Sequence, residues 1–146
     1  MYKNILLPID LESENSWKRA LPQAIDLANH YKARLHLLTV VPEMVSVGTP
    51  LMMPYFPDDW EKKLIDHAGG MLKAFAEKNI PAALKATFSI ARGSIYVQIL
   101  ATAEDRKSDL IVMASHRPEI RDYLIGPNAA HVVRHAPCSV FVVRGD

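Results

Sequence analysis

The chain has 146 residues, 49% of them hydrophobic and 23% charged, which is typical of a single globular domain over residues 1–146. Its 17 basic and 16 acidic residues nearly balance, so the basic stripe of a nucleic-acid-binding protein is missing. No apolar stretch approaches the roughly 20 residues that cross a bilayer. These features predict a protein whose main partner is neither nucleic acid nor a membrane.

Cysteine usage and the amino-terminal sequence bear on location. Cys138 is the only cysteine, so no intrachain disulfide can form, and a reducing compartment is expected. The first residues lack the long apolar core of a signal peptide. We therefore expect a cytoplasmic protein.

Five short apolar runs have the length of β-strands. Four are apolar on successive residues, as is typical of strands buried on both faces. Between Leu84 and Ile90 apolar and polar residues alternate instead, which predicts a half-exposed strand at or near a sheet edge. In chain order the runs cover residues 4–9, 35–41, 84–91, 110–114 and 139–143.

Helical periodicity separates these runs. An apolar face from Trp17 to Ala28 predicts the first helix, and Pro22 should bend it or delay its start. Further helices are predicted over residues 64–76, over residues 95–103 with Ser94 as the N-cap, and from Gly126 onward. Alternating strands and helices imply parallel strands with right-handed crossovers. The sequence therefore predicts a three-layer α/β/α fold around a doubly wound five-stranded parallel sheet.

In such a fold the ligand lies beyond the carboxyl ends of the strands, where the strand order reverses. Asp10 follows the first apolar run, so its carboxylate is placed to accept hydrogen bonds from a ribose or a base. The alternative is that Asp10 is a turn residue that helps to start the next helix, and spacing alone slightly favours this alternative. The stretch from Pro42 to Pro57, rich in Met and Pro, is either a lid or contact surface or a plain surface insertion.

A second candidate site lies near the carboxyl terminus. The fourth strand runs into a loop that contains Ser115, His116 and Arg117, and Gly126 and Pro127 then open the last helix. The amides of a helix N-terminus bind phosphate, and His116 or Arg117 would add charge. Alternatively, Gly126 and Pro127 form an ordinary helix start. His131 and His135 share a helical face without an evident third metal ligand, so we expect them to face solvent.

Two stretches resemble the universal stress protein family, and the resemblance extends over essentially the whole chain. They are YKNILLPID at residues 2–10 and VMASHRPEIRDYLIGPNAAHVVRHAPCSVFVVR at residues 112–144, whose ASHRP run is most similar to the F/G-type bacterial subgroup. The resemblance implies a Rossmann-like fold of the adenine nucleotide alpha hydrolase-like kind. It also implies an ATP site, with Mg²⁺, made by Pro8, Ile9, Asp10, Val40, Met113, Ala114, Ser115, His116, Arg117, Gly126, Pro127, Asn128 and Ala129.

The sequence departs from the ATP-binding branch of that family. The branch carries a Gly-x-x-Gly loop, a spacer of about nine residues, and Gly-Ser or Gly-Thr at the helix start. Here Ala114 and Arg117 replace the loop glycines, the spacer is one residue shorter, and Pro127 follows Gly126. Arg117 adds bulk and a cation, and Pro127 removes a hydroxyl and an N–H, for which the Asn128 amide can compensate.

No Gly-x-Ser-x-Gly elbow and no Walker lysine is present, so the sequence predicts binding rather than catalysis. We expect an ATP-binding regulatory protein; the alternatives are a nucleotide-free interaction module and, last, a weak ATP hydrolase. The final strand, Ser139 to Val143, is apolar, and no later segment of this sequence can cover its far side, which favours pairing with a second copy. The family resemblance likewise implies a homodimer through this strand.

Overall fold

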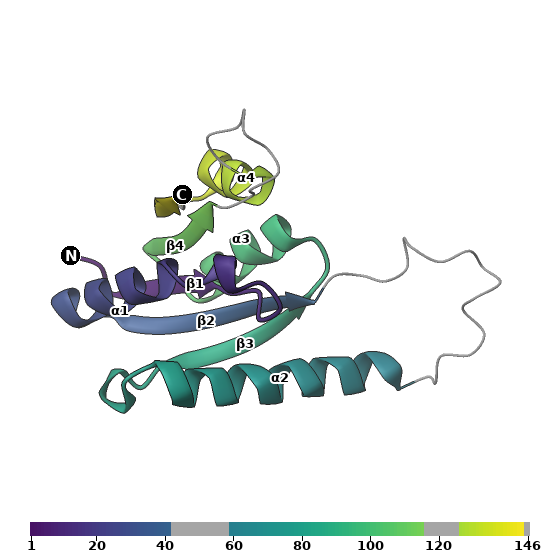
Figure 1. Cartoon of the computed structure of the whole chain (residues 1–146). Helices are drawn as coiled ribbons and strands as arrows, with labels where there is room; N and C mark the ends of the chain where they lie inside the picture. Colours follow the sequence, from purple (N-terminus) through teal and green to yellow (C-terminus); the bar gives the residue numbers. More distant parts are fainter. Residues whose placement is uncertain (42–58, 116–125, 145–146) are drawn as a thin grey trace.

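The computed structural model describes residues 1–41, 59–115 and 126–144, in which one five-stranded sheet lies between two pairs of helices (Figure 1). All strand pairs are parallel, and the spatial order is β3-β2-β1-β4-β5. The order reverses between β1 and β4, which confirms the predicted doubly wound fold. The strands are β1 (Asn4–Pro8), β2 (Arg34–Val41), β3 (Thr87–Arg92), β4 (Leu110–Ser115) and β5 (Ser139–Arg144).

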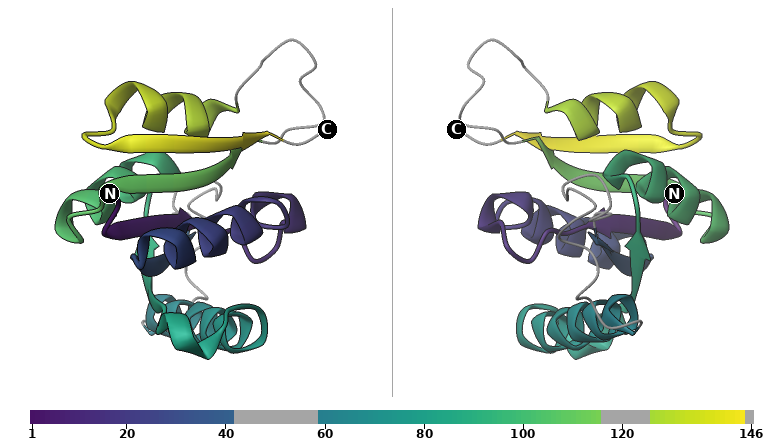
Figure 2. Two further views of the ribbon diagram at one scale, coloured as in Figure 1. Left: turned by 90° about the vertical axis from the view of Figure 1, so that its left-hand side faces the viewer. Right: turned by 90° about the vertical axis from the view of Figure 1, so that its right-hand side faces the viewer.

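Each face of the sheet is covered by two helices (Figure 2). Helices α1 (Ala20–Tyr31) and α2 (Trp60–Asn79) pack on one face, and α3 (Ile95–Asp105) and α4 (Pro127–His135) pack on the other. Side chains alternate between the two layers, so Leu7 packs toward α1 and α2 whereas Leu6 packs toward α3 and α4. Both leucines are fully buried, as predicted for a central parallel strand.

The third strand begins later than the sequence pattern predicted. Thr87 is its first residue, so residues 84–86 were wrongly assigned to it. They alternate like a strand, but the chain first forms a 3₁₀ turn, η3 (Ala82–Leu84), after Pro81, and Lys85 then adopts a left-handed conformation with φ of 50°. The predicted edge position of this strand is confirmed, because β3 is the last strand in the sheet order and, within the described residues, pairs with β2 alone.

The first helix begins at Ala20, after the short 3₁₀ turn η1 (Glu14–Ser16). Pro22 therefore lies in the first turn, where its missing N–H breaks no helical hydrogen bond, and the predicted delay is confirmed. Ser94 is the N-cap residue of α3, although its side chain makes no capping bond. None of the helices in the described ranges has the length and hydropathy of a membrane span.

Candidate functional site

The carboxyl ends of three neighbouring strands meet at one edge of the sheet, which we call the carboxyl edge (Figure 1). There β1 ends at Pro8, β4 ends at Ser115, and β2 continues to Val41. This edge contains the point where the strand order reverses, which is the usual ligand position in doubly wound folds. The segments that contribute predicted site residues to it are 8–10, 40 and 113–115, and residues 126–129 start α4 close by.

Because β1 ends at Pro8, the last residues of β2 have no neighbouring strand on the β1 side within the described ranges. The Ile9 amide donates to the Leu38 carbonyl at 2.8 Å, and the Ile9 carbonyl accepts from the buried Thr39 hydroxyl at 2.9 Å. Because the peptide groups of alternate residues in a parallel strand point to the same side, Val40 directs its N–H and C=O as Leu38 does. No backbone hydrogen bond continues the ladder from Ile9 to Val40 in the described residues. The Val40 peptide groups therefore face the space beyond β1.

Asp10 is exposed and forms the turn that leads into η1. Its Oδ1 accepts from the Glu12 amide at 3.0 Å, while the Ser16 hydroxyl accepts from the Asp10 amide at 2.9 Å and donates to the Asp10 carbonyl at 2.8 Å. The turn-residue interpretation of Asp10 is thus observed. It does not exclude a ligand contact, because Oδ2 accepts no hydrogen bond from the described residues.

The start of α4 is tied to the end of β4. The Gly126 amide donates to Ser115 Oγ at 3.2 Å, and Pro127 occupies the first helical position, where it has no N–H to offer. The first helical bond runs from the Ala130 amide to the Gly126 carbonyl at 2.8 Å. The amides of Asn128 and Ala129 consequently have no carbonyl partner within the helix. They are the two backbone donors that this helix start offers to an anion.

The remaining predicted site residues either have buried or half-buried side chains or lie outside the described residues. The side chains of Met113 and Ala129 are buried against α3 and α4, so only their backbone can reach a ligand. Ala114 is half-buried and packs on the opposite side of the sheet, toward α1. His116, Arg117 and the stretch from Pro42 to Pro57 lie outside the described residues.

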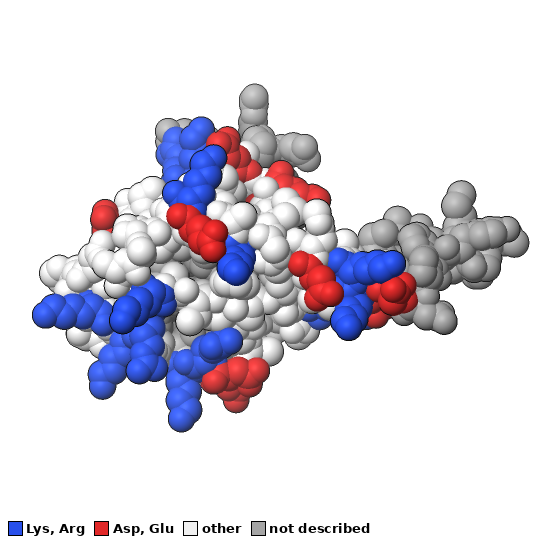
Figure 3. Space-filling model, turned by 90° about the horizontal axis from the view of Figure 1, so that it is seen from below, with Lys and Arg blue, Asp and Glu red and all other residues white. Residues whose placement is uncertain are grey.

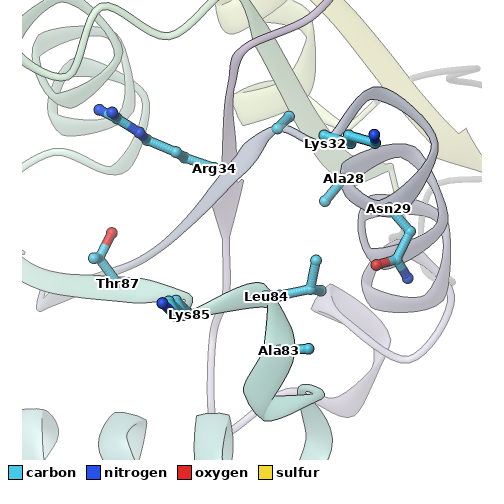
Figure 4. A pocket seen from close by; sticks show the side chains of 9 residues that line it. Ala28, Asn29, Lys32, Arg34, Ala83, Leu84, Lys85 and Thr87 are labelled. Atoms are coloured by element: carbon cyan, nitrogen blue, oxygen red, sulfur yellow. The ribbon is translucent and has the colours of Figure 1, made fainter.

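A hollow of about 640 Å³ lies at the opposite, amino edge of the sheet, between the end of α1, η3 and the starts of β2 and β3 (Figure 4). Its lining includes Lys32, Arg34 and Lys85, and Lys and Arg side chains gather over this end of the molecule (Figure 3). No sequence motif marks it, because its residues come from two separate stretches of the chain, 28–34 and 83–87. Arg34 and Lys32 point away from each other rather than into the hollow, so these two cations do not converge on a ligand.

A buried histidine, His36, is not indicated by any sequence motif. His36, in β2, is 5% exposed, with Nδ1 2.7 Å from Thr87 Oγ1 and Nε2 2.8 Å from Ser89 Oγ. Burial, and secondarily the charge of Arg106, lowers the pKa of His36 from 6.5 to about 4. The ring is therefore neutral near pH 7. It lies level with the start of β3, away from the carboxyl edge, so we assign it a structural role.

The other candidate histidines belong to the surface. His131 and His135 are exposed, as predicted, with parallel rings 6.4 Å apart, and His131 stacks on Tyr96 at 4.3 Å. Within the described ranges no three His, Cys, Asp or Glu side chains are grouped so as to hold a metal ion.

The strand order defines a doubly wound α/β protein, a class in which ligands usually lie beyond the carboxyl ends of the central strands, here β1, β2 and β4. The model of the universal stress protein family matches residues 1–144, and the chain belongs to this family. Universal stress protein G of Escherichia coli O157:H7 is 30% identical over 147 residues, covering 99% of this chain and all of the relative. The same protein of Salmonella typhimurium is 29% identical with the same coverage.

Solved structures agree with this assignment. The universal stress protein UspA from Lactobacillus plantarum is 27% identical, with a TM-score of 0.76 over 98% of each chain. A universal stress protein crystallised in complex with cAMP is 20% identical, with a TM-score of 0.61 over 99% of this chain and 98% of that one. At that identity the second structure supports the fold alone.

Proposed function

We propose that this universal stress protein binds ATP at the carboxyl edge of its sheet and acts as a nucleotide-dependent regulatory protein. The observation that carries the proposal is the Val40 peptide unit, whose donor and acceptor face the space beyond the end of β1. An adenine ring edge carries the complementary acceptor and donor. The Asn128 and Ala129 amides at the start of α4 belong to the same edge and suit the phosphates.

The same arrangement suggests how the ribose and a metal ion would be held. Asp10 Oδ2 is the acceptor for a ribose hydroxyl, while Oδ1 keeps the turn closed. Mg²⁺ would arrive bound to the phosphate oxygens, since it retains several waters and needs few protein ligands. A family member with cAMP bound is consistent with an adenine nucleotide as the ligand class.

Regulation is preferred over catalysis because the described residues of the carboxyl edge offer no base placed to activate water. Asp10 Oδ1 accepts from the Glu12 amide, Asp10 Oδ2 is the proposed acceptor for the ribose, and the Ser115 hydroxyl accepts from the Gly126 amide. A weak hydrolase therefore ranks last. ATP would act by binding one state of the protein, or of its dimer, better than another.

A nucleotide-free interaction module is the second candidate, and the start of α4 favours it. Pro127 supplies no N–H, and the Gly126 amide already donates to the Ser115 hydroxyl. The helix start thus offers fewer free donors than a start with Gly and Ser would. If this candidate is correct, the surface of the protein alone carries the function.

Calorimetric titration with ATP and Mg²⁺ separates the candidates. We expect measurable binding by the wild type and an affinity about 10- to 150-fold weaker for Asp10→Ala, because a hydrogen bond to a charged group contributes about 1.5–3 kcal/mol. Asp10→Asn keeps an acceptor for the Glu12 amide and so reports the contribution of the turn. Glu12→Ala removes a neighbouring exposed carboxylate and should bind like the wild type.

The outcomes are distinct. Absence of heat and of competition up to millimolar nucleotide would defeat ATP binding and favour the interaction module. Sustained phosphate release that is lost in Asp10→Ala would instead favour the hydrolase.

We further propose that two copies pair through β5. This strand forms one edge of the sheet, and α4 packs over one of its faces. Phe141 pairs with Val112, whose side chain belongs to the core on the α1 side of the sheet, so Phe141 lies on the face of β5 opposite to α4. Its exposed fraction is 42%. An edge strand with an uncovered aromatic residue and unpaired peptide groups is suited to strand pairing.

A further inference from the structure

Helix α2 consists of two halves that are held in different ways. In its carboxyl-terminal half Leu72 is fully buried, and Phe75 and Ala76 pack against the core on the α1 side of the sheet. In its amino-terminal half Leu64 and Ile65 are half-buried, but neither belongs to the core clusters formed by the described residues. Among the described residues, the second half alone therefore joins these core clusters.

Two adjacent glycines, Gly69 and Gly70, lie at the boundary between these halves. A β-carbon on Gly69 would lie 3.9 Å from Cγ1 of Ile90, which is ordinary van der Waals contact, and one on Gly70 would meet open space. Packing therefore does not require either glycine. Inside a helix, glycine is among the residues that most weaken helical structure. The helix is locally weak at the point where its core anchoring ends.

A polar contact holds the amino-terminal half against the sheet. Glu61, in the first turn of α2, forms an ion pair with Arg92 at the end of β3, and both side chains are partly exposed. Ion pairs of this kind are weak and are screened by salt. This contact ties the first turn of the helix to the carboxyl edge of the sheet.

From these three observations we infer that Gly69 and Gly70 form a hinge. The amino-terminal half of α2, which we call the arm (residues 60–68), lifts from β3 as a helical unit while the second half stays in the core. The Glu61–Arg92 pair is the latch that closes the arm. Opening separates the partly exposed Arg92 guanidinium from the Glu61 carboxylate, which changes the charge presented at the carboxyl edge. This inference does not depend on nucleotide binding.

Distance measurements between two spin labels test the hinge in the full chain. Lys62→Cys in the arm and Glu77→Cys in the anchored half, both exposed, are labelled in a Cys138→Ser background. In a straight helix these positions are about 22 Å apart. We expect the wild-type glycines to give a broad distribution that includes shorter distances. Gly69→Ala with Gly70→Ala should reduce the short-distance fraction about tenfold or more, because each alanine favours the helix about fivefold.

Two further variants test the latch. Glu61→Gln removes the charge that pairs with Arg92 and should increase the short-distance fraction severalfold, whereas Lys63→Gln changes a neighbouring exposed charge and should leave it unchanged. A single narrow distribution near the straight-helix distance, identical with glycine and with alanine at positions 69 and 70, would overturn the hinge. Equal distributions for Glu61→Gln and Lys63→Gln would overturn the latch.

Discussion

Val142→Lys should elute as a monomer at protein concentrations at which we expect the wild type to elute as a dimer. Val142 lies in β5, the edge strand through which we propose that two copies pair, and it is half-buried in the single chain. Its partner Met113 belongs to the α4 side of the sheet, so a lysine at that position places an ammonium group on the α4 face of the proposed contact. Burying an unpaired charge costs several kcal/mol, so the dissociation constant should rise by about a hundredfold or more.

Two companion variants show whether the effect belongs to this interface. Phe141→Lys replaces a more exposed side chain on the other face of β5 and should also give monomers, with less risk to the fold. Phe88→Lys alters an exposed aromatic residue on β3, at the opposite edge of the sheet, and should remain dimeric. Dimeric elution of both β5 variants, measured by light scattering, would exclude β5 as the interface.

Acidification should destabilise the protein through His36. The folded state holds the pKa of His36 near 4, whereas the unfolded chain has the ordinary value of 6.5. Between these values the unfolded chain binds a proton that the folded protein does not, so the free energy of unfolding falls as the pH falls from 6.5 toward 4. The contribution of the neutral His36 ring to stability is fully present above pH 6.5. The free energy of unfolding should drop by about 2 kcal/mol between pH 7 and pH 5.

Urea unfolding at the two pH values measures this effect. His36→Gln removes the titrating ring and should abolish most of the difference, whatever its effect on stability at pH 7. His131→Gln replaces an exposed histidine of α4 and should behave as the wild type does. If His36→Gln kept the full acid sensitivity, the burial of His36 could not be its cause.

The fold was predictable because its strongest signals are local. Strands buried on both faces require consecutive apolar residues, as at Ile5, Leu6 and Leu7, and this pattern revealed the central strands. The predicted start of β3 was wrong because Leu84 and Ala86 alternate with polar residues as strand residues do. Their positions are set instead by a 3₁₀ turn after Pro81.

The details of the candidate site depend on contacts between distant segments. Ser115 and Gly126 appeared in the sequence as separate features, and their hydrogen bond became visible only in the fold. The orientation of the Val40 peptide follows from the register of β1 against β2, which no motif encodes. His36 lies in an apolar run, and its partners are 51 and 53 residues away in the chain. Such pairings follow from topology rather than from local pattern.

Amide chemical shifts recorded during titration with ATP and Mg²⁺ test the proposed site most directly. The account predicts that the shifts cluster at Asp10, Val40, Asn128 and Ala129, at the carboxyl edge. Shifts confined to the hollow around Lys32 and Lys85, or no shifts at millimolar ATP, would contradict it.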